Sequence, residues 1–199
     1  MSDPVLVPGL VPCGGSLLDE RSRPDFRDVF GALARRSTSI ATAVTRVRLS
    51  TLDLGDDELV GVRRFQVVLA EMNALTLDAE ARTLARLPRR AEVLRGLAGR
   101  LEAGTLEVRA APLGGWSPDF TVFSDDSGPL AVLSGYHWFE RPYPHRGPAL
   151  AALHLGDAAR LALRRHREVW GHAHDVGPAL WTLLARADTR AREHGLRAG

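Results

Sequence analysis

Residues 106–155 constrain the fold more than any other part of the chain, because short apolar segments alternate there with turns. Residues 120–124 and 130–134 are two apolar runs, and the sequence Asp-Asp-Ser-Gly-Pro separates them. Two such runs joined by a short polar turn predict a pair of neighbouring strands. An aromatic-rich segment follows at residues 136–139. We expect the polar side chains of a functional site to lie in the loop that leaves the second strand, which we call the exit loop.

Helical periodicity surrounds these strands. In residues 24–36, apolar side chains recur at the i, i+3, i+4 and i+7 positions that form one face of a helix. Residues 76–102 are helical in composition, but Pro88 should kink or split them. Residues 158–172 and 180–194 predict two more helices. Their apolar faces are expected to contain Ala159, Leu163, His166 and Trp170 in the first, and Trp181, Leu184 and Ala187 in the second.

Four further segments have the composition of strands, at residues 39–49, 65–70, 106–110 and 148–155. Gly104 stands where a glycine commonly ends a helix, and Gly156 with Asp157 is expected to cap the helix that follows. Strands that alternate with long helical crossovers predict a mixed, mostly parallel sheet covered on both faces. The predicted fold class is therefore α/β, a three-layer α/β/α arrangement.

The composition fits one globular domain. A chain of 199 residues is long enough to bury one core, and no stretch approaches the roughly 20 apolar residues of a membrane span. The apolar start of the chain lacks the basic residues of a signal peptide, so we expect a cytoplasmic protein. Cys13 is the single cysteine, which excludes an internal disulfide and a thiolate metal cluster.

All 26 basic residues of the chain are arginine. Guanidinium groups suit phosphate oxygens, but an arginine bias also arises from a GC-rich genome, so composition allows a nucleic-acid partner without requiring one. For each of two arginine clusters taken alone, a solvated helix face is the simpler interpretation. These clusters are Arg82, Arg86, Arg89 and Arg90, and Arg160, Arg164, Arg165 and Arg167.

The order of elements over residues 26–173 resembles the phospholipase D-like superfamily of phosphodiesterases and nucleases. In that family a catalytic segment, His-x-Lys, four residues and Asp, precedes a strand that ends in Gly-Ser-x-Asn, often followed by Trp. Residues 133–139, Leu-Ser-Gly-Tyr-His-Trp-Phe, are similar to that strand end. Ser134 and Gly135 are inverted relative to the motif, and His137 replaces its Asn.

The residues that match the catalytic segment imply a degenerate site. Asp125 matches the motif's Asp, Pro118 takes the position of the catalytic His and Phe120 that of the Lys. The family's His is a nucleophile and its Lys binds phosphate oxygens, so neither replacement can do that work. Because the chain contains no lysine, no shift of the alignment restores the motif.

Polar residues behind the aromatic segment are the remaining site candidates. The resemblance implies a phosphate-binding rim of Ser134, Gly135, His137 and Arg141. His137 could hold a proton or an anion near neutral pH, but a histidine packed between its aromatic neighbours is the simpler interpretation. Glu140 and His145 could complete an acid/base site with it, whereas a surface loop is the commoner explanation.

Two other groups of side chains, one aromatic and one of histidines, have simple structural explanations. Aromatic side chains near the exit loop could stack on bases, but closing the end of the core is their more common role. These are Trp116, Trp138, Phe139 and Tyr143. His166, His172 and His174 invite a zinc site, yet no carboxylate or thiol stands at a convincing spacing. We therefore expect no metal and no cofactor.

The leading expectation is a non-catalytic phospholipase D-like domain that binds or scaffolds DNA or another phosphodiester polymer. Residues 1–22 would form an arm laid along a sheet edge, residues 23–176 the phospholipase D-like domain, and residues 177–199 a C-terminal helix. The resemblance also implies a homodimer, because family members with one motif per chain typically pair their half-sites. Two alternatives stay open: a phosphodiesterase or nuclease rebuilt around His137, and a protein-interaction subunit.

Overall fold

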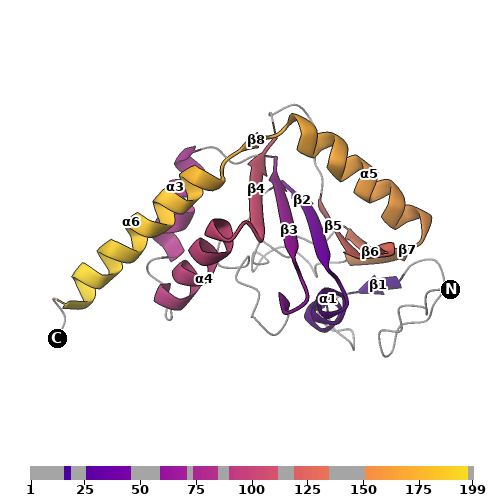
Figure 1. Ribbon diagram of the computed structural model, residues 1–199, viewed down its shortest axis with the longest axis horizontal. Coiled ribbons are helices and arrows are strands. Elements are labelled where there is room, and N and C mark those ends of the chain that lie inside the picture. Colours follow the sequence, from indigo (N-terminus) through magenta and orange to yellow (C-terminus); the bar gives the residue numbers. More distant parts are fainter. Residues whose placement is uncertain are drawn as a thin grey trace.

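One mixed sheet runs through the molecule (Figure 1). The computed structural model describes residues 16–18, 26–45, 59–70, 74–84, 90–111, 119–134 and 151–196. Within these residues the sheet has eight strands in the order β1-β7-β6-β5-β2-β3-β4-β8. The strands are β1 (Ser16–Leu18), β2 (Ser39–Val44), β3 (Arg64–Leu69), β4 (Leu106–Ala110), β5 (Asp119–Asp125), β6 (Gly128–Ser134), β7 (Ala151–Leu155) and β8 (His174–Asp175).

Helices cover both faces of the sheet, and Figure 1 shows α5 apart from α3, α4 and α6. The helices are α1 (Phe26–Arg35), α3 (Ala74–Leu84), α4 (Arg90–Glu102), α5 (Asp157–His172) and α6 (Gly177–Leu196). α1, α3, α4 and α6 share the larger core with one face of the sheet, while α5 packs on the other face. The predicted three-layer α/β/α fold is therefore confirmed. No helix in the described part of the chain is long and apolar enough to cross a membrane.

The central strand β2 shows how the sequence builds two cores. Successive side chains of a strand point to opposite faces. Ile40 and Val44 accordingly lie in the larger core, while Ala41 and Ala43 lie in the two small clusters under α5. The small side chains let α5 approach the sheet closely, and Ala159 of α5 packs there with no exposed surface.

The sheet is mixed, as predicted, but the expectation that it would be mostly parallel is wrong. Only β2–β3 and β3–β4 are parallel among the described strands. The β1–β7, β2–β5, β5–β6, β6–β7 and β4–β8 pairs are antiparallel. The short turn between β5 and β6 produces an antiparallel hairpin, and this hairpin joins both β2 and β7 in antiparallel pairs, so antiparallel pairs outnumber the parallel ones.

Local signals placed most element ends correctly. The helical stretch that contains Pro88 is divided, since α3 ends at Leu84 and α4 begins at Arg90. Gly104 has a φ of 69°, which glycine adopts without steric cost, and its N–H donates to the Leu101 carbonyl at 3.1 Å. β1 pairs with β7 at the sheet edge, where the arm was expected to lie.

Two details of the helices differ from the predictions. Gly156 is the N-cap residue of α5, as expected, but Asp157 is the first residue of the helix rather than part of its cap. In α6, Leu184 and Ala187 are buried as expected, but Trp181 is 43% exposed. Leu180 takes the buried position instead, because it stands four residues before Leu184 and so shares its face.

Candidate anion-binding cleft

The structure separates the residues that resemble the catalytic motif. Phe120 lies directly opposite Ser134 across the β5–β6 ladder, whereas Asp125 pairs with Gly128 at the other end. With a rise of about 3.4 Å per residue, the five residues from Phe120 to Asp125 span about 17 Å. Ser134 and Phe120 therefore share one end of the hairpin, which we call the motif end, and Asp125 lies at the opposite end.

Most of the predicted site residues fall outside the described residues. These are Pro118, Gly135, His137, Glu140, Arg141 and His145, together with the aromatic residues Trp116, Trp138, Phe139 and Tyr143. The phosphate-binding rim and the rebuilt acid/base site therefore stay predictions.

At the motif end, β5 begins with Asp119 and Phe120, and neither side chain is cationic. Phe120 packs against both small clusters under α5. Its neighbour Asp119 accepts hydrogen bonds from the Thr45 backbone N–H at 3.3 Å and from the Thr45 hydroxyl at 3.4 Å. An aromatic ring and a carboxylate stand where the family's chemistry needs a phosphate-binding charge.

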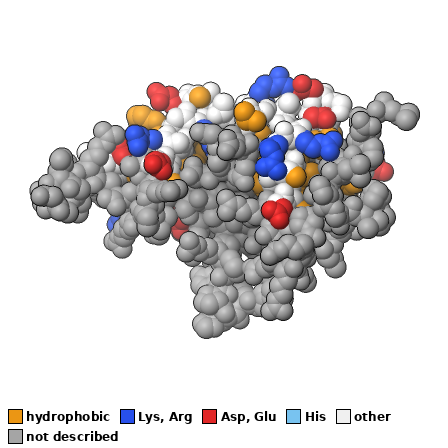
Figure 2. All heavy atoms as spheres, turned by 90° about the horizontal axis from the view of Figure 1, so that it is seen from below, with side chains coloured by type: hydrophobic (Ala, Val, Ile, Leu, Met, Phe, Trp, Pro, Cys, Tyr) orange, Lys and Arg blue, Asp and Glu red, His pale blue; other side chains and the backbone are white. Residues whose placement is uncertain are grey.

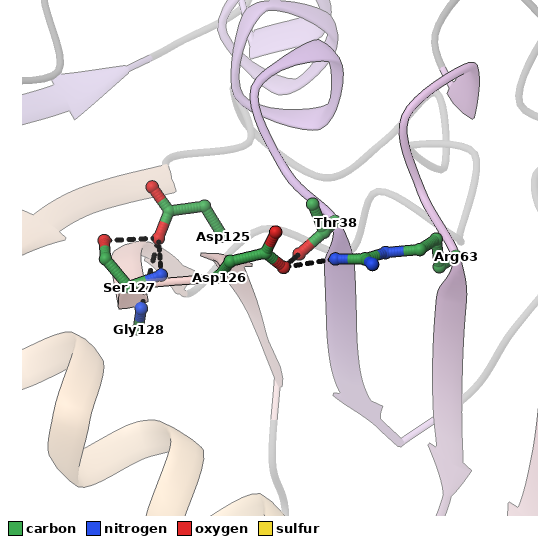
Figure 3. Close-up of polar contacts among 6 residues, drawn as sticks. All are labelled: Thr38, Arg63, Asp125, Asp126, Ser127 and Gly128. Atoms are coloured by element: carbon green, nitrogen blue, oxygen red, sulfur yellow. Dashed lines mark hydrogen bonds and ion pairs between the residues drawn. The ribbon is translucent and has the colours of Figure 1, made fainter.

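Asp125 closes the turn between β5 and β6 (Figure 3). Its Oδ1 accepts hydrogen bonds from the Ser127 hydroxyl at 2.6 Å, the Ser127 N–H at 2.8 Å and the Gly128 N–H at 3.1 Å. The hydrogen bond from the Ser127 side chain is the largest cause that lowers the pKa of Asp125. An aspartate that bonds to the backbone two residues on is a common turn device. The motif-like Asp125 thus has a structural role.

The neighbouring carboxylate points away from this turn (Figure 3). Asp126 accepts a hydrogen bond from the Thr38 hydroxyl at 3.1 Å and forms an ion pair with Arg63. Thr38 precedes β2 and Arg63 precedes β3. The turn is therefore tied to the beginnings of two central strands.

A cleft of about 920 Å³ opens beside this turn, between α5 and the end of the sheet where β2 and β3 begin. We call it the α5 cleft. Its neutral polar lining comes from Ser39, Gln66 and Ser124 of the sheet and from Ser127 of the turn. Its basic lining consists of Arg64 from β3 and Arg160, Arg164 and Arg167 from α5.

The three arginines of α5 stand at positions i, i+4 and i+7, so they lie on one side of the helix. Arg160 donates a 3.0 Å hydrogen bond through Nε to Asp157. Arg164 and Arg167 form no ion pair with any described residue. Arg165 does not line the cleft and pairs with Glu168 at 2.9 Å. Among the described residues, Arg164 and Arg167 are thus the two guanidinium groups of the α5 cleft that have no ion-pair partner.

The fourth arginine of the cleft is already paired. Arg64 donates through Nε to Glu107 at 2.6 Å, and this hydrogen bond raises the pKa of Arg64. The carboxylates near the cleft are engaged too: Asp125 in its turn, Asp126 with Arg63 and Asp157 with Arg160. On the face that Figure 2 shows, basic and acidic side chains are likewise interspersed. Asp125 has no cationic partner among the described residues, so Arg164 and Arg167 together outweigh one free carboxylate and leave the described lining with a small net positive charge.

The remaining sequence candidates lie elsewhere. Arg82 forms an ion pair with Asp78 on the exposed side of α3, and Arg86 and Arg89 fall outside the described residues. His166 is buried on the inner side of α5, whereas His172 and His174 are exposed. Within the described ranges, no three histidine, cysteine or acidic side chains could together hold a metal ion.

Sequence reasoning identified half of this cleft. The spacing of Arg160, Arg164 and Arg167 was visible, but a solvated helix face seemed simpler because the facing residues were unknown. Ser39 and Ser124 face each other in the β2–β5 ladder although 85 positions separate them in the chain. Only the sheet register brings these hydroxyls opposite α5.

No family model matches the sequence, and no curated protein is significantly similar to it. Several solved structures are similar in fold. NucT from Helicobacter pylori is 11% identical with a TM-score of 0.52, over 81% of this chain and 98% of that one. TrmBL2, an archaeal chromatin protein, is 13% identical with a TM-score of 0.51, over 85% of this chain and 57% of that one. Nuc from Salmonella typhimurium, a phospholipase D family member, is 13% identical with a TM-score of 0.49, over 81% of this chain and 96% of that one.

Proposed function

Because the chain has the phospholipase D-like fold, we propose that it is a non-catalytic binding domain for a phosphodiester polymer, with DNA as the leading candidate. Its predicted binding surface is the α5 cleft. The observation that carries the proposal is the pair Arg164 and Arg167, which face the cleft without an ion-pair partner among the described residues.

The chemistry of the cleft supports an anionic ligand. A guanidinium group donates two parallel hydrogen bonds to phosphate oxygens, and neighbouring hydroxyl and amide groups can donate to the oxygens that remain. Ser39, Gln66 and Ser124 supply such groups on the floor of the cleft. A fold neighbour, the archaeal chromatin protein TrmBL2, binds DNA, so the fold is compatible with this role.

The absence of catalysis is inferred from the motif positions. Pro118 offers no nucleophile and Phe120 no charge, and the neighbouring Asp119 adds a carboxylate rather than a cation. We therefore expect binding without cleavage of the polymer.

A binding measurement tests the proposal. Arg164→Ala and Arg167→Ala together should weaken binding of fluorescent DNA at 50 mM salt at least about tenfold, since two phosphate contacts are lost. Arg165→Ala is the matched control, because it removes an arginine of the same helix that does not line the cleft. DNA recovered after incubation should be intact. Equal weakening by the control, or no binding by the natural chain, would refute the proposal.

We further propose that two copies associate. The resemblance implies pairing of half-sites, with residues 116–143 near the two-fold axis. Sedimentation equilibrium should then give twice the chain mass of 21.6 kDa at micromolar concentration. A mass of one chain across the concentration range would contradict the dimer without affecting the binding proposal.

A further inference from the structure

The lining of the α5 cleft indicates which form of nucleic acid it takes. Sites for single strands combine basic grooves with aromatic side chains on which bases stack, and each stacked base contributes substantially to affinity. The described residues that line the α5 cleft are arginine, aspartate, serine, glutamine, alanine, leucine, glycine and proline, and none is aromatic. The described lining therefore offers groups for phosphates and no aromatic ring on which a base could stack.

The arginine spacing fits the backbone of a duplex. At 1.5 Å per helical residue, Arg164 and Arg167 lie about 4.5 Å apart along α5. One strand of a duplex presents a phosphate about every 3.4 Å along the axis, so neighbouring phosphates of one strand can each meet one of these two arginines. A rigid duplex holds these phosphates at a fixed spacing, whereas a single strand must first be ordered.

Resting on the proposed function, we infer that the α5 cleft binds the sugar–phosphate backbone of duplex nucleic acid without reading the base sequence. One strand lies across the mouth of the cleft, with its phosphates against Arg164 and Arg167, and the bases stay paired outside it. Phosphate contacts of this kind fix position but carry no sequence information.

The salt dependence of binding measures the number of contacts. For duplex DNA, log K falls with log salt at a slope of about −0.9 per phosphate neutralised. Two free arginines predict a slope of about −1.8, which is about a tenfold loss of affinity between 50 and 200 mM salt. Arg164→Ala should reduce the slope by about 0.9, and Arg165→Ala should leave it unchanged.

The test measures how tightly the 199-residue chain binds each of four probes. These are an AT-rich duplex, a GC-rich duplex, a single strand of equal length, and vesicles of phosphatidylserine and phosphatidylcholine. We expect the two duplexes to bind within about twofold of each other and several-fold more tightly than the single strand, with little binding to vesicles. Equal or tighter binding of the single strand overturns the duplex inference but leaves the proposed function intact. Vesicle binding as tight as duplex binding would indicate that the ligand of the cleft is a lipid headgroup rather than nucleic acid. Failure of every probe to bind refutes both proposals.

Discussion

His166 makes the stability of the fold depend on pH. Its side chain has no exposed surface and stacks on Trp170 with a 5.6 Å centroid separation. Neither ring nitrogen makes a hydrogen bond of normal geometry within the described structure. Burial lowers the pKa of His166 to about 4, an interaction with the Thr42 backbone opposes the shift, and the positive charges of Arg167 and Arg64 add to it.

This shift predicts the sign and size of an acid destabilisation. The unfolded chain binds a proton near pH 6.5, whereas the folded chain resists it until about pH 4. The stability contributed by neutral His166 is therefore full above pH 6.5 and is lost as pH falls toward 4. We expect the free energy of unfolding to fall by about 2 kcal/mol between pH 7 and pH 5.

Urea denaturation of His166→Leu at the two pH values checks this prediction. The variant should lose most of the pH dependence, because the buried titratable group is gone. His172→Gln, which removes an exposed histidine of the same helix, should keep it. An unchanged pH dependence in His166→Leu would show that other groups cause the effect.

At the scale of elements, α5 has two sides with different roles. Its inner side packs on the sheet through Ala159 and Leu163, while its arginine side forms the wall of the cleft. Arg160 is held by Asp157 one turn earlier in an exposed ion pair. Exposed pairs of this kind contribute little to stability, so they can be removed without unfolding the helix.

Asp157→Asn should therefore increase affinity for the polymer. The change frees Arg160 for a third phosphate contact, so the salt slope should become steeper by up to about 0.9. Glu168→Gln is the control, because it frees Arg165, which does not line the cleft. Titration of duplex DNA at several salt concentrations measures both variants. The same change in both, or none in Asp157→Asn, would exclude Arg160 from the site.

At the scale of the whole molecule, the hairpin β5–β6 offers two candidate ends. The sequence resemblance points to the motif end with Ser134, and the geometry points to the α5 cleft beside Asp125. We expect Ser134→Ala to change DNA affinity less than about twofold, while the pair Arg164→Ala and Arg167→Ala abolishes most binding. A larger loss from Ser134→Ala would place the ligand at the motif end.

The sequence predicts those features of the fold that depend on neighbouring residues alone. β4 falls at residues 106–110, as its alternating pattern predicts, and the helices separate around Pro88. β8 has two residues, too few for any periodicity to appear. Strand direction and the meeting of Ser39, Ser124 and Arg164 depend on contacts between distant segments. No window of neighbouring residues contains that information, so the cleft could only be half predicted.

Within the residues that the structure describes, the sheet ends at both edges in very short strands, β1 with three residues and β8 with two. An edge strand offers its unpaired backbone groups to any extended chain nearby, and a short one offers few of them. This architecture therefore limits edge-to-edge association, which otherwise leads to aggregation. We therefore expect the proposed dimer to form through side chains on a face or at an end of the sheet, as two separate sheets rather than one continuous sheet.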